Sequence, residues 1–582
     1  MGDTKNFVLF AVLSLAILLG YQTFYAGPKM EAARTEAAAA RTEQAAEEAL
    51  APREIAPEDA TTAEVVDTET ALANAGSVKI VTPELEGSLS LRGARFDDLQ
   101  LVKHTVGMAK DSQKVRLLSP AGSPNAYYAR FGWSASGQNP DTVPTDKSIW
   151  TADSETLTPE TPVTLSWENG EGLTFLMKVE VDKEFMFTVT QSVENTTDAT
   201  IQMAPYGLIS RHGKPQTAGL YILHEGPLGV FNGTLEEKSY SDLEDDGNFE
   251  VSSTGGWMGI TDKYWMTTLI PAQDADLSRA RFVRRAPQGG EESYRVDYVE
   301  NWQTLAAGSR LESTTRFYAG AKIVGTIDDY QQKYDIALFD RTIDWGWFYW
   351  LTRPIFKGLH FLFNFTGNYG IAILLMTVIL KVLLFPLANK SYVSMSHMKK
   401  AQPKIKQLQE RYKDDRQKLQ QEMMALYQKE KINPMAGCLP ILVQIPIFFA
   451  LYKVLYVTIE MRHQPFFGWI KDLSAPDPLT PVNFFGLIPW DPPAFMAIGI
   501  LPILMGLSMW LQQKLNPQSA AMDPTQQKIM SFLPLIFTFI MAPFSAGLVL
   551  YWTWNNILSI AQQWVIMRRE DARIEDKGKA KA

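Results

Sequence analysis

The sequence predicts a polytopic α-helical membrane protein with about six spans, a cytoplasmic helical hairpin and a large extracytoplasmic all-β sandwich domain. Its 582 residues are too many for a single hydrophobic core. Residues 1–344 contain 30 Lys and Arg against 50 Asp and Glu, whereas residues 345–582 contain 25 against 14. Apolar stretches recur within the basic part, although the mean hydropathy of the whole chain is only -0.11.

The composition also excludes several classes of protein. The single cysteine, Cys438, cannot form an intramolecular disulfide, and no Cys or His residues have metal-ligand spacing. No nucleotide-binding loop or hydrolase motif occurs, so we expect no metal, no cofactor, no catalytic residue and no enzyme activity. The acidic first part argues against DNA as the main partner.

The chain is expected to begin with a membrane anchor and a tether. Residues 1–6 form a cytoplasmic N-terminus, and residues 7–25 form an uncharged apolar run that is long enough to cross a bilayer as a signal anchor. A cleaved signal peptide is the alternative interpretation. Residues 26–77, rich in Ala, Glu, Thr and Pro, are expected to be a disordered tether.

Residues 78–340 show the pattern of a β sandwich. Short alternating or β-branched runs, such as Leu173–Val181, are separated by turn signals, such as Asn169–Gly170. No helical periods lie between them, which favours an antiparallel sandwich. The lone histidines His212 and His224 are more typical of structural groups than of catalysts.

An aromatic segment at residues 341–367 follows the β domain. Arg353, Lys357 and His360 are spaced to share one face of a helix, which predicts an amphipathic helix in the headgroup region of the bilayer.

Five further spans are predicted in the basic part, at residues 368–388, 435–458, 494–512, 529–542 and 547–566. The fourth of these is short for a bilayer. Segment 389–434 contains eleven basic residues and is therefore expected in the cytoplasm. Residues 459–493 then form an external loop, residues 513–528 a cytoplasmic loop, and residues 567–582 a basic cytoplasmic tail.

Lys381 stands out because it lies inside an apolar run. Burying an ammonium group in a bilayer costs at least about 2.5 kcal/mol, so such a charge is a candidate for function. The alternative is that Lys381 reaches the headgroups from a nearby helix end. Other polar residues of the spans could line a wet cavity with it: Thr377, Gln444, Asn555, Asn556, Gln562 and Gln563.

The cytoplasmic segment 389–434 has two apolar stripes at helical spacing. The stripes predict a helical hairpin whose arms bury them against each other, and they consist of Ile405, Leu408, Tyr412, Leu419, Met423 and Leu426. A solvated connector without a partner is the alternative.

Several short motifs together resemble the YidC membrane protein insertase family of Gram-negative type. They are Met423–Tyr427, Lys431–Pro434, Gly437–Pro440, Gln444–Phe448, Asp472–Ser474, Asp523–Met530 and Gly547–Tyr551. The resemblance covers essentially the whole chain. It implies that the external domain is similar to a β-supersandwich of the kind found in sugar mutarotases, although such a fold does not confer an activity.

The resemblance also implies a hydrophilic substrate groove. Its expected residues are Lys381, Thr377, Gln444, Tyr551, Trp552 and Asn555. Lys381 stands where many members have an arginine, so the charge is kept but the planar fork of donors is lost. Trp552 stands where relatives often have tyrosine.

The implied function is to insert nascent integral membrane proteins and to help them fold and assemble. The implied partners are nascent membrane proteins, the Sec translocon (SecYEG and accessory subunits), the ribosome and signal-recognition targeting machinery, and membrane lipids. The implied location is the inner membrane, with both termini cytoplasmic and the β domain periplasmic. Two alternatives are a transporter for an anionic solute with an external receptor domain, and a tethered carbohydrate-active enzyme. We find neither the repeated halves of the first nor the carboxylate and histidine set of the second.

Overall fold

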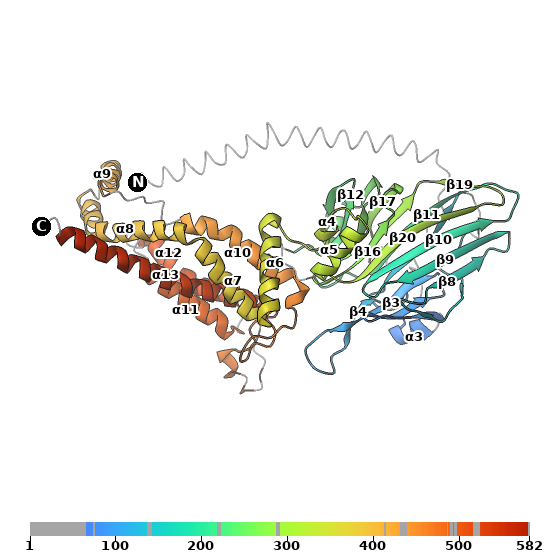
Figure 1. The fold of residues 1–582 in the computed structure, drawn as a ribbon, viewed down its shortest axis with the longest axis horizontal. Helices are drawn as coiled ribbons and strands as arrows, with labels where there is room; N and C mark the ends of the chain where they lie inside the picture. Colours follow the sequence, from blue (N-terminus) through green and yellow to red (C-terminus); the bar gives the residue numbers. More distant parts are fainter. Residues whose placement is uncertain are drawn as a thin grey trace. The chain divides into compact units, whose positions relative to one another are not determined.

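The computed structural model describes residues 66–73, 76–136, 142–217, 223–286, 292–412, 415–430, 439–485, 487–488, 490, 493, 497–515 and 524–579. The predicted anchor at residues 7–25 and most of the predicted tether at 26–77 lie outside these ranges. The chain forms two compact units, one of which contains Ala401–Ile432. The other contains a β domain followed by most of the helices (Figure 1).

The β domain consists of two sheets. The larger has 11 strands, in the order β14 (Phe249–Thr254), β17 (Asp276–Arg285), β18 (Ser293–Glu300), β11 (Ile201–His212), β5 (Tyr127–Ala135), β3 (Arg95–Thr105), β2 (Leu85–Ser90), β1 (Ser77–Val81) and β7 (Thr156–Leu157). In addition, β19 (Gln303–Leu305) pairs with β11, and β4 (Lys114–Leu118) pairs with β3.

The second sheet has nine strands. Their order is β13 (Thr234–Glu237), β12 (Gly226–Phe231), β15 (Trp257–Thr261), β16 (Trp265–Pro271), β20 (Arg310–Ala321), β10 (Met186–Asn195), β9 (Leu173–Val181), β8 (Val163–Glu168) and β6 (Thr151–Ala152). The pairing is antiparallel within this sheet, and in the larger sheet only β1 and β7 are parallel. The prediction of a large all-β sandwich ahead of the helices is confirmed.

Alternating sequence produces the register of these strands. In β9, buried positions alternate with more exposed ones, and Val179 faces Val189 of β10 with both side chains buried. The Asn169–Gly170 turn joins β8 to β9, and Gly170 has the positive φ of 74° that such a turn requires.

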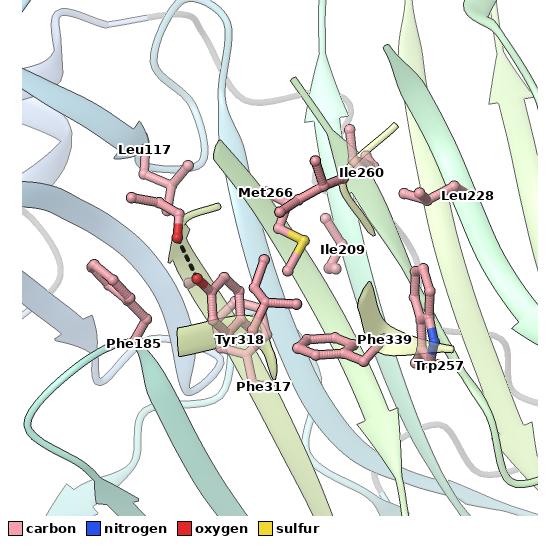
Figure 2. Packing of buried hydrophobic residues seen from close by; sticks show 14 of the residues in the cluster. Leu117, Phe185, Ile209, Leu228, Trp257, Ile260, Met266, Phe317, Tyr318 and Phe339 are labelled. Carbon is pink, nitrogen blue, oxygen red and sulfur yellow. Dashed lines mark hydrogen bonds between the residues drawn. The ribbon is translucent and has the colours of Figure 1, made fainter. Parts of the chain in front are cut away.

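The core lies between the two sheets. Phe96 and Phe131 of the larger sheet meet Phe187 and Phe317 of the smaller one, with ring centroids 5.2 Å apart for Phe96 and Phe187. Figure 2 shows the same core farther along, where side chains of both sheets are packed around Met266. This continuous apolar layer holds the sheets together without disulfides.

Short helices lie before, within or after the sandwich and in the connection between Val457 and Ile500, and longer helices follow the sandwich. The short ones are α3 (Thr68–Ala73), α4 (Tyr240–Asp245), α5 (Val324–Lys333), η3 (Phe339–Thr342), η5 (Ile459–Met461) and η6 (Pro481–Asn483). The longer ones are α6 (Tyr349–Thr366), α7 (Tyr369–Leu383), α8 (Phe385–Arg411), α9 (Arg416–Lys429), α10 (Leu439–Val457), α11 (Ile500–Leu515), α12 (Pro524–Met541) and α13 (Ala546–Lys579). Helix α6 packs on α7 and α10, and α13 packs on α7, α10 and α11.

The predicted span at residues 368–388 is not one helix. Helices α7 and α8 are bent by 67° relative to each other at Leu384. Pro386 explains the break, because it has no N–H to donate to the Val382 carbonyl of the preceding turn. As a result, α8 contains both the end of the predicted span and the first arm of the hairpin predicted at 389–434.

Other helix ends also differ from the predicted boundaries. Helix α6 begins at Tyr349 rather than near residue 341, because Gly346 adopts a left-handed φ of 71° before it. Helix α10 is described from Leu439, within the predicted span 435–458. Helix α11 begins at Ile500 rather than at 494 and ends at Leu515 rather than at 512.

The last two helices are longer than the spans predicted at 529–542 and 547–566. Helix α12 is described from Pro524, so it takes in part of the loop predicted at 513–528. Helix α13 continues to Lys579, so the predicted tail at 567–582 is largely helical. Polar contacts hold this extension on α8: the Ser396 hydroxyl donates to the Asp571 carboxylate at 2.7 Å, His397 lies 3.5 Å from Glu570, and Lys400 lies 3.8 Å from Asp571.

Among the described residues, no single helix is both long and apolar enough to cross a membrane alone. The bent pair α7 and α8 passes that test of length and composition together. Shorter apolar stretches lie at Leu442–Val457 and Lys528–Met541. The number of spans therefore stays a prediction.

Candidate functional site

A small polar cavity lies where α7, α10 and α13 meet. Its volume is about 10 Å³, which is room for about one water molecule. The cavity is lined by Thr377, Leu380, Lys381, Leu384, Gln444, Tyr551 and Asn555. The structure thus brings together five of the six residues that the sequence assigned to a groove.

Lys381 occupies the last turn of α7, directly before the break at Leu384. Its side chain is half-buried, and its Nζ donates to the Ser559 Oγ of α13 at 2.8 Å. The carbonyl groups at a helix C-terminus carry partial negative charge, which favours an ammonium group there. In the part of the chain that the structure describes, no carboxylate forms an ion pair with Lys381. The site therefore holds a positive charge that hydrogen bonding stabilises but does not neutralise.

The other polar side chains of the cavity are fixed by hydrogen bonds. Gln444 of α10 donates from Nε2 to the hydroxyl of buried Tyr551 in α13 at 2.7 Å. Thr377 is buried, and its hydroxyl donates to the Ile373 carbonyl one turn earlier in α7. The Gln444 bond joins α10 to α13, as the Lys381 bond to Ser559 joins α7 to α13. All of these bonds satisfy polar groups that apolar helices would otherwise leave unpaired.

Three other predicted residues, Trp552, Asn556 and Gln563, do not line the cavity. The Trp552 ring packs against Phe448 and Phe537, with centroids 4.6 Å and 5.5 Å away. Asn556 donates to the Ser508 hydroxyl of α11, and Gln563 donates to the Leu515 carbonyl. These amides join α13 to α11 instead of wetting the site.

Ser559 is the site residue that the sequence analysis missed. Its hydroxyl also donates to the Asn555 carbonyl at 2.7 Å, so it connects Lys381 to the backbone of α13. A sequence signal was present, because Ser559 lies four residues after Asn555 and therefore on the same face of a helix.

The hairpin residues are only partly buried. Ile405 is buried, whereas Leu408 and Tyr412 of α8 are half-buried. The stripe on α9 is also half-buried, at Leu419, Met423 and Leu426. Lys404 and Glu430 form an ion pair at 2.6 Å that joins α8 to the residue after α9. Full burial of the two stripes against each other stays a prediction.

The β domain is attached to the end of α10 and the segment after it by polar contacts. Glu460 accepts the Val324 N–H at 2.9 Å and so caps α5, whose own N-cap residue, Ile323, provides no side-chain bond. Burial raises the pKa of Glu460 to about 7. Lys453 of α10 pairs with Asp344 at 2.6 Å, with both side chains largely buried.

A second set of contacts completes this attachment. Arg462 donates to the carbonyl groups of Thr105, at 2.6 Å, and Val106 in the β3–β4 hairpin. The Lys263 ammonium lies 3.6 Å from the centre of the Tyr456 ring. Three segments of the β domain, at Thr105–Val106, Lys263 and Val324, are therefore fixed to the helices by contacts that each involve one charged side chain.

Comparison with known proteins identifies the family. Residues 361–573 match the family model described as 60Kd inner membrane protein, and residues 77–358 match the YidC periplasmic domain. A "Membrane protein insertase YidC" of Methylorubrum extorquens (strain PA1) is 46% identical over 602 residues, with 99% of this chain and 97% of the relative covered. The chain belongs to the YidC membrane protein insertase family.

A second relative agrees with this assignment. The relative from Bradyrhizobium diazoefficiens is also 46% identical, with 99% of this chain and 98% of the relative covered. A solved structure described as an active YidC insertase has 15% sequence identity, a TM-score of 0.34, and coverage of 86% of this chain and 94% of that chain.

Membership of the YidC family confirms several predictions. The motif resemblance was correct, and the family consists of insertases rather than enzymes. The family description places such proteins in the inner membrane, and the periplasmic-domain model covers the β sandwich.

Proposed function

We propose that this protein inserts newly made membrane proteins into the inner membrane by receiving their polar segments at the cavity around Lys381. The observation that carries the proposal is a half-buried ammonium group, held by Ser559 between α7 and α13, without a carboxylate partner among the described residues. A segment that must cross the membrane loses hydration, and a fixed positive charge beside it offsets part of that cost when the segment is acidic.

The proposed topology has six spans with both termini in the cytoplasm and the β domain in the periplasm. The excess of basic residues in 389–434 and in the C-terminal segment supports this orientation. The energy for insertion then comes from burial of the substrate's apolar span and from the membrane potential, because the sequence contains no nucleotide-binding motif.

The cavity is too small to be a preformed site for a small solute. Sites for small molecules usually measure about 300–1,000 Å³, whereas this cavity has room for about one water molecule. The cavity acts as a polar contact along the path of a chain, and substrate entry separates α7 from its neighbours. Leu383 lies two residues after Lys381 and is exposed, so this end of α7 is open to a translocating segment.

The proposed partners are the machinery that delivers nascent chains and the Sec translocon. The hairpin of α8 and α9 captures nascent chains from the ribosome and the signal-recognition targeting machinery. Insertion then proceeds alone or beside the Sec translocon, including SecYEG and its accessory subunits. The positive surface of the hairpin suits contact with ribosomal RNA or with anionic lipids.

The test compares charge variants in proteoliposomes. We expect Lys381→Arg to keep insertion, and Lys381→Ala to reduce insertion several-fold for substrates with acidic external tails. Lys514→Ala is the matched control, because Lys514 occupies the last turn of α11 and is exposed. Equal insertion of every substrate by Lys381→Ala would reject a role for the charge.

Photocrosslinking locates the path of the substrate. A photoreactive residue at Thr377 or Asn555 should capture stalled nascent membrane proteins. The same residue at Thr538, which is buried on α12 near Gly506, should not. Capture from Thr538 alone would move the path away from the cavity.

A further inference from the structure

The connection between α10 and α11 carries an exposed segment without charge. From Leu479 to Trp490 the sequence has no Asp, Glu, Lys or Arg. Six large apolar side chains in it are exposed, and we call them the apolar tip: Val482, Phe484, Phe485, Leu487, Ile488 and Trp490. Phe484 is 64% exposed and Leu487 is 80% exposed. In Figure 1 this connection extends to one side of the helices.

The backbone of the tip is held in an unfavourable conformation. Phe484 has φ 53° and ψ 45°, and Phe485 has φ 61°, so two bulky neighbours are both left-handed. Hydrogen bonds maintain this turn: Phe485 N–H donates to the Thr480 carbonyl at 3.0 Å, and Ile488 N–H donates to the Asn483 carbonyl at 3.1 Å. Strain of this kind persists where other contacts fix it, and it often marks a functional segment.

Asp477 anchors the base of the tip. Its buried carboxylate accepts from the Trp469 indole N–H at 2.9 Å, from the Leu479 N–H at 3.0 Å and from the Leu501 N–H at 2.7 Å. The last of these bonds lies in the first turn of α11. The tip is therefore positioned firmly relative to the start of that helix.

The apolar surface continues from the tip along the chain into α11. Ile503, Leu504 and Leu507 are exposed on that helix, which belongs to the region matched by the inner membrane protein model. Phe, Trp and Leu without charged neighbours are typical of groups that enter the bilayer interface. A protein partner would be expected to meet a polar rim around an apolar centre, and the tip provides no charged side chain for one.

We propose that the apolar tip inserts into the interfacial region of the outer leaflet and anchors the external ends of α10 and α11 in the lipid. The proposal rests on the topology given under the proposed function, which places this connection outside. The Asp477 bonds transmit the anchoring to α11, and the left-handed turn keeps both phenylalanine rings directed to the lipid.

The depth of the tip can be measured with an environment-sensitive fluorophore. In the full chain carrying Cys438→Ser, a nitrobenzoxadiazole label is attached at Phe484→Cys or Leu487→Cys. Lys471→Cys is the control, because Lys471 is exposed in the same connection but lies before Asp477. The proteins are reconstituted in vesicles of phosphatidylethanolamine and phosphatidylglycerol, and quenching by nitroxide lipids is compared with quenching by iodide.

The proposal predicts opposite behaviour at the two kinds of site. Labels at 484 and 487 should emit at shorter wavelength, be quenched at least three-fold more by lipids with a shallow nitroxide than the label at 471, and resist iodide. Quenching by iodide at 484 equal to that at 471 would overturn the proposal. Protection from iodide without lipid quenching, dependent on protein density, would also overturn it and would indicate contact with a second copy.

Two further measurements distinguish a failure of the tip proposal from a failure of the proposed topology. Phe484→Asn with Phe485→Asn keeps residues that tolerate the left-handed backbone but removes both rings, so the label at 487 should become accessible to iodide. Whether added iodide reaches the label at 471 shows, independently of the tip, on which side of the membrane residue 471 lies. If 471 is external and 484 is in water, the tip proposal alone fails, whereas an internal 471 refutes the topology.

Discussion

Single residues in this protein have properties that depend on partners from distant segments. Lys381 and Ser559 are 178 positions apart, and Val324 and Glu460 are 136 apart. The sequence identified Lys381 because a charge in an apolar run is unusual. It did not identify Glu460, because a glutamate in a loop is ordinary until its burial and its partner are known.

Glu460 predicts a pH dependence of stability. Its folded pKa of about 7 lies above its ordinary value of 4.5, so the folded state binds the proton more tightly than the unfolded chain. The stability from Glu460 is therefore complete below about pH 4.5 and is lost as the pH rises through about 7, by about 3 kcal/mol at most. Glu460→Gln keeps an acceptor for Val324 and should remove this dependence.

The measurement is the apparent melting temperature of the protein in lipid nanodiscs from pH 4.5 to 8. The difference between wild type and Glu460→Gln should grow with pH and level off above about pH 7. Glu312→Gln, at an exposed position in β20, should follow wild type throughout. A constant difference between wild type and Glu460→Gln would contradict the shifted pKa.

At the scale of elements, the strands were more predictable than the helix ends. Strand β9 was expected at Leu173–Val181 and is found there, because alternation along one segment determines which face is buried. The ends of α12 and α13 depend on what each helix meets. Asp571 extends α13 by binding Ser396 of α8, and no local pattern contains that contact. The break after α7 was not predicted, although Pro386, which removes an N–H from the helix, was a local signal for it.

Pro386 is therefore expected to control the bend between α7 and α8. Pro386→Ala restores an N–H that can donate to Val382 and should straighten the pair. Spin labels at Leu375 and Lys390 should then move apart toward about 22 Å along the axis of a straight helix. Pro403→Ala is the control, because Pro403 lies inside continuous α8 and its removal should leave the distance unchanged.

The same variant has a functional consequence. Straightening removes the helix C-terminus beside Lys381, so insertion of substrates with acidic tails should fall several-fold. An unchanged distance between the labels would show that packing rather than proline sets the bend. A straightened pair with full insertion would show that the bend is not required.

The hairpin predicts that the effect of an introduced aspartate follows the burial of the residue it replaces. Ile405→Asp places an unpaired carboxylate at a buried position, which costs several kcal/mol or forces the helix to open. Leu408→Asp should have a smaller effect because Leu408 is half-buried, and Gln407→Asp should have almost none because Gln407 is exposed. Hydrogen exchange of α9 and crosslinking to nascent chains should follow this order. Equal crosslinking by all three would argue against a capture role for the hairpin.

At the scale of the whole molecule, the division into an acidic β part and a basic helical part was predictable from charge and periodicity. The attachment between these parts was not. Glu460 and Arg462 are unremarkable in the sequence, and Lys453, although it is a charge inside the predicted span 435–458, gives no sign of its partner. Their partners come from β-domain segments or from the segment that leads into α6, and only the fold brings them together. The groove residues were assigned mainly through the family motifs. Of these, Trp552 does not line the cavity, because its ring packs against Phe448 and Phe537.

The contacts that attach the β domain to the helices predict the effect of deleting that domain. Deletion of residues 78–338 removes the sandwich and α5 but leaves Asp344, so the ion pair between Asp344 and Lys453 persists. Glu460 loses the Val324 N–H, and Arg462 loses its acceptors in the β3–β4 hairpin. We expect the deletion variant to melt at a lower temperature than wild type and to keep insertion within about three-fold, because no cavity residue lies in the deleted part.

A second change distinguishes loss of attachment from loss of function. In the deletion variant, Asp344→Asn removes the last of these attachment contacts to α10, the helix that presents Gln444 to the cavity. If the β domain serves to hold α10 in place, this variant should lose both stability and insertion, whereas Asp344→Asn in the full chain should lose less because Glu460 and Arg462 still bind. Membrane fractionation provides the control for protein level. Complete loss of insertion by the simple deletion, in protein that is present in the membrane at the wild-type level, would mean that the sandwich itself takes part in insertion.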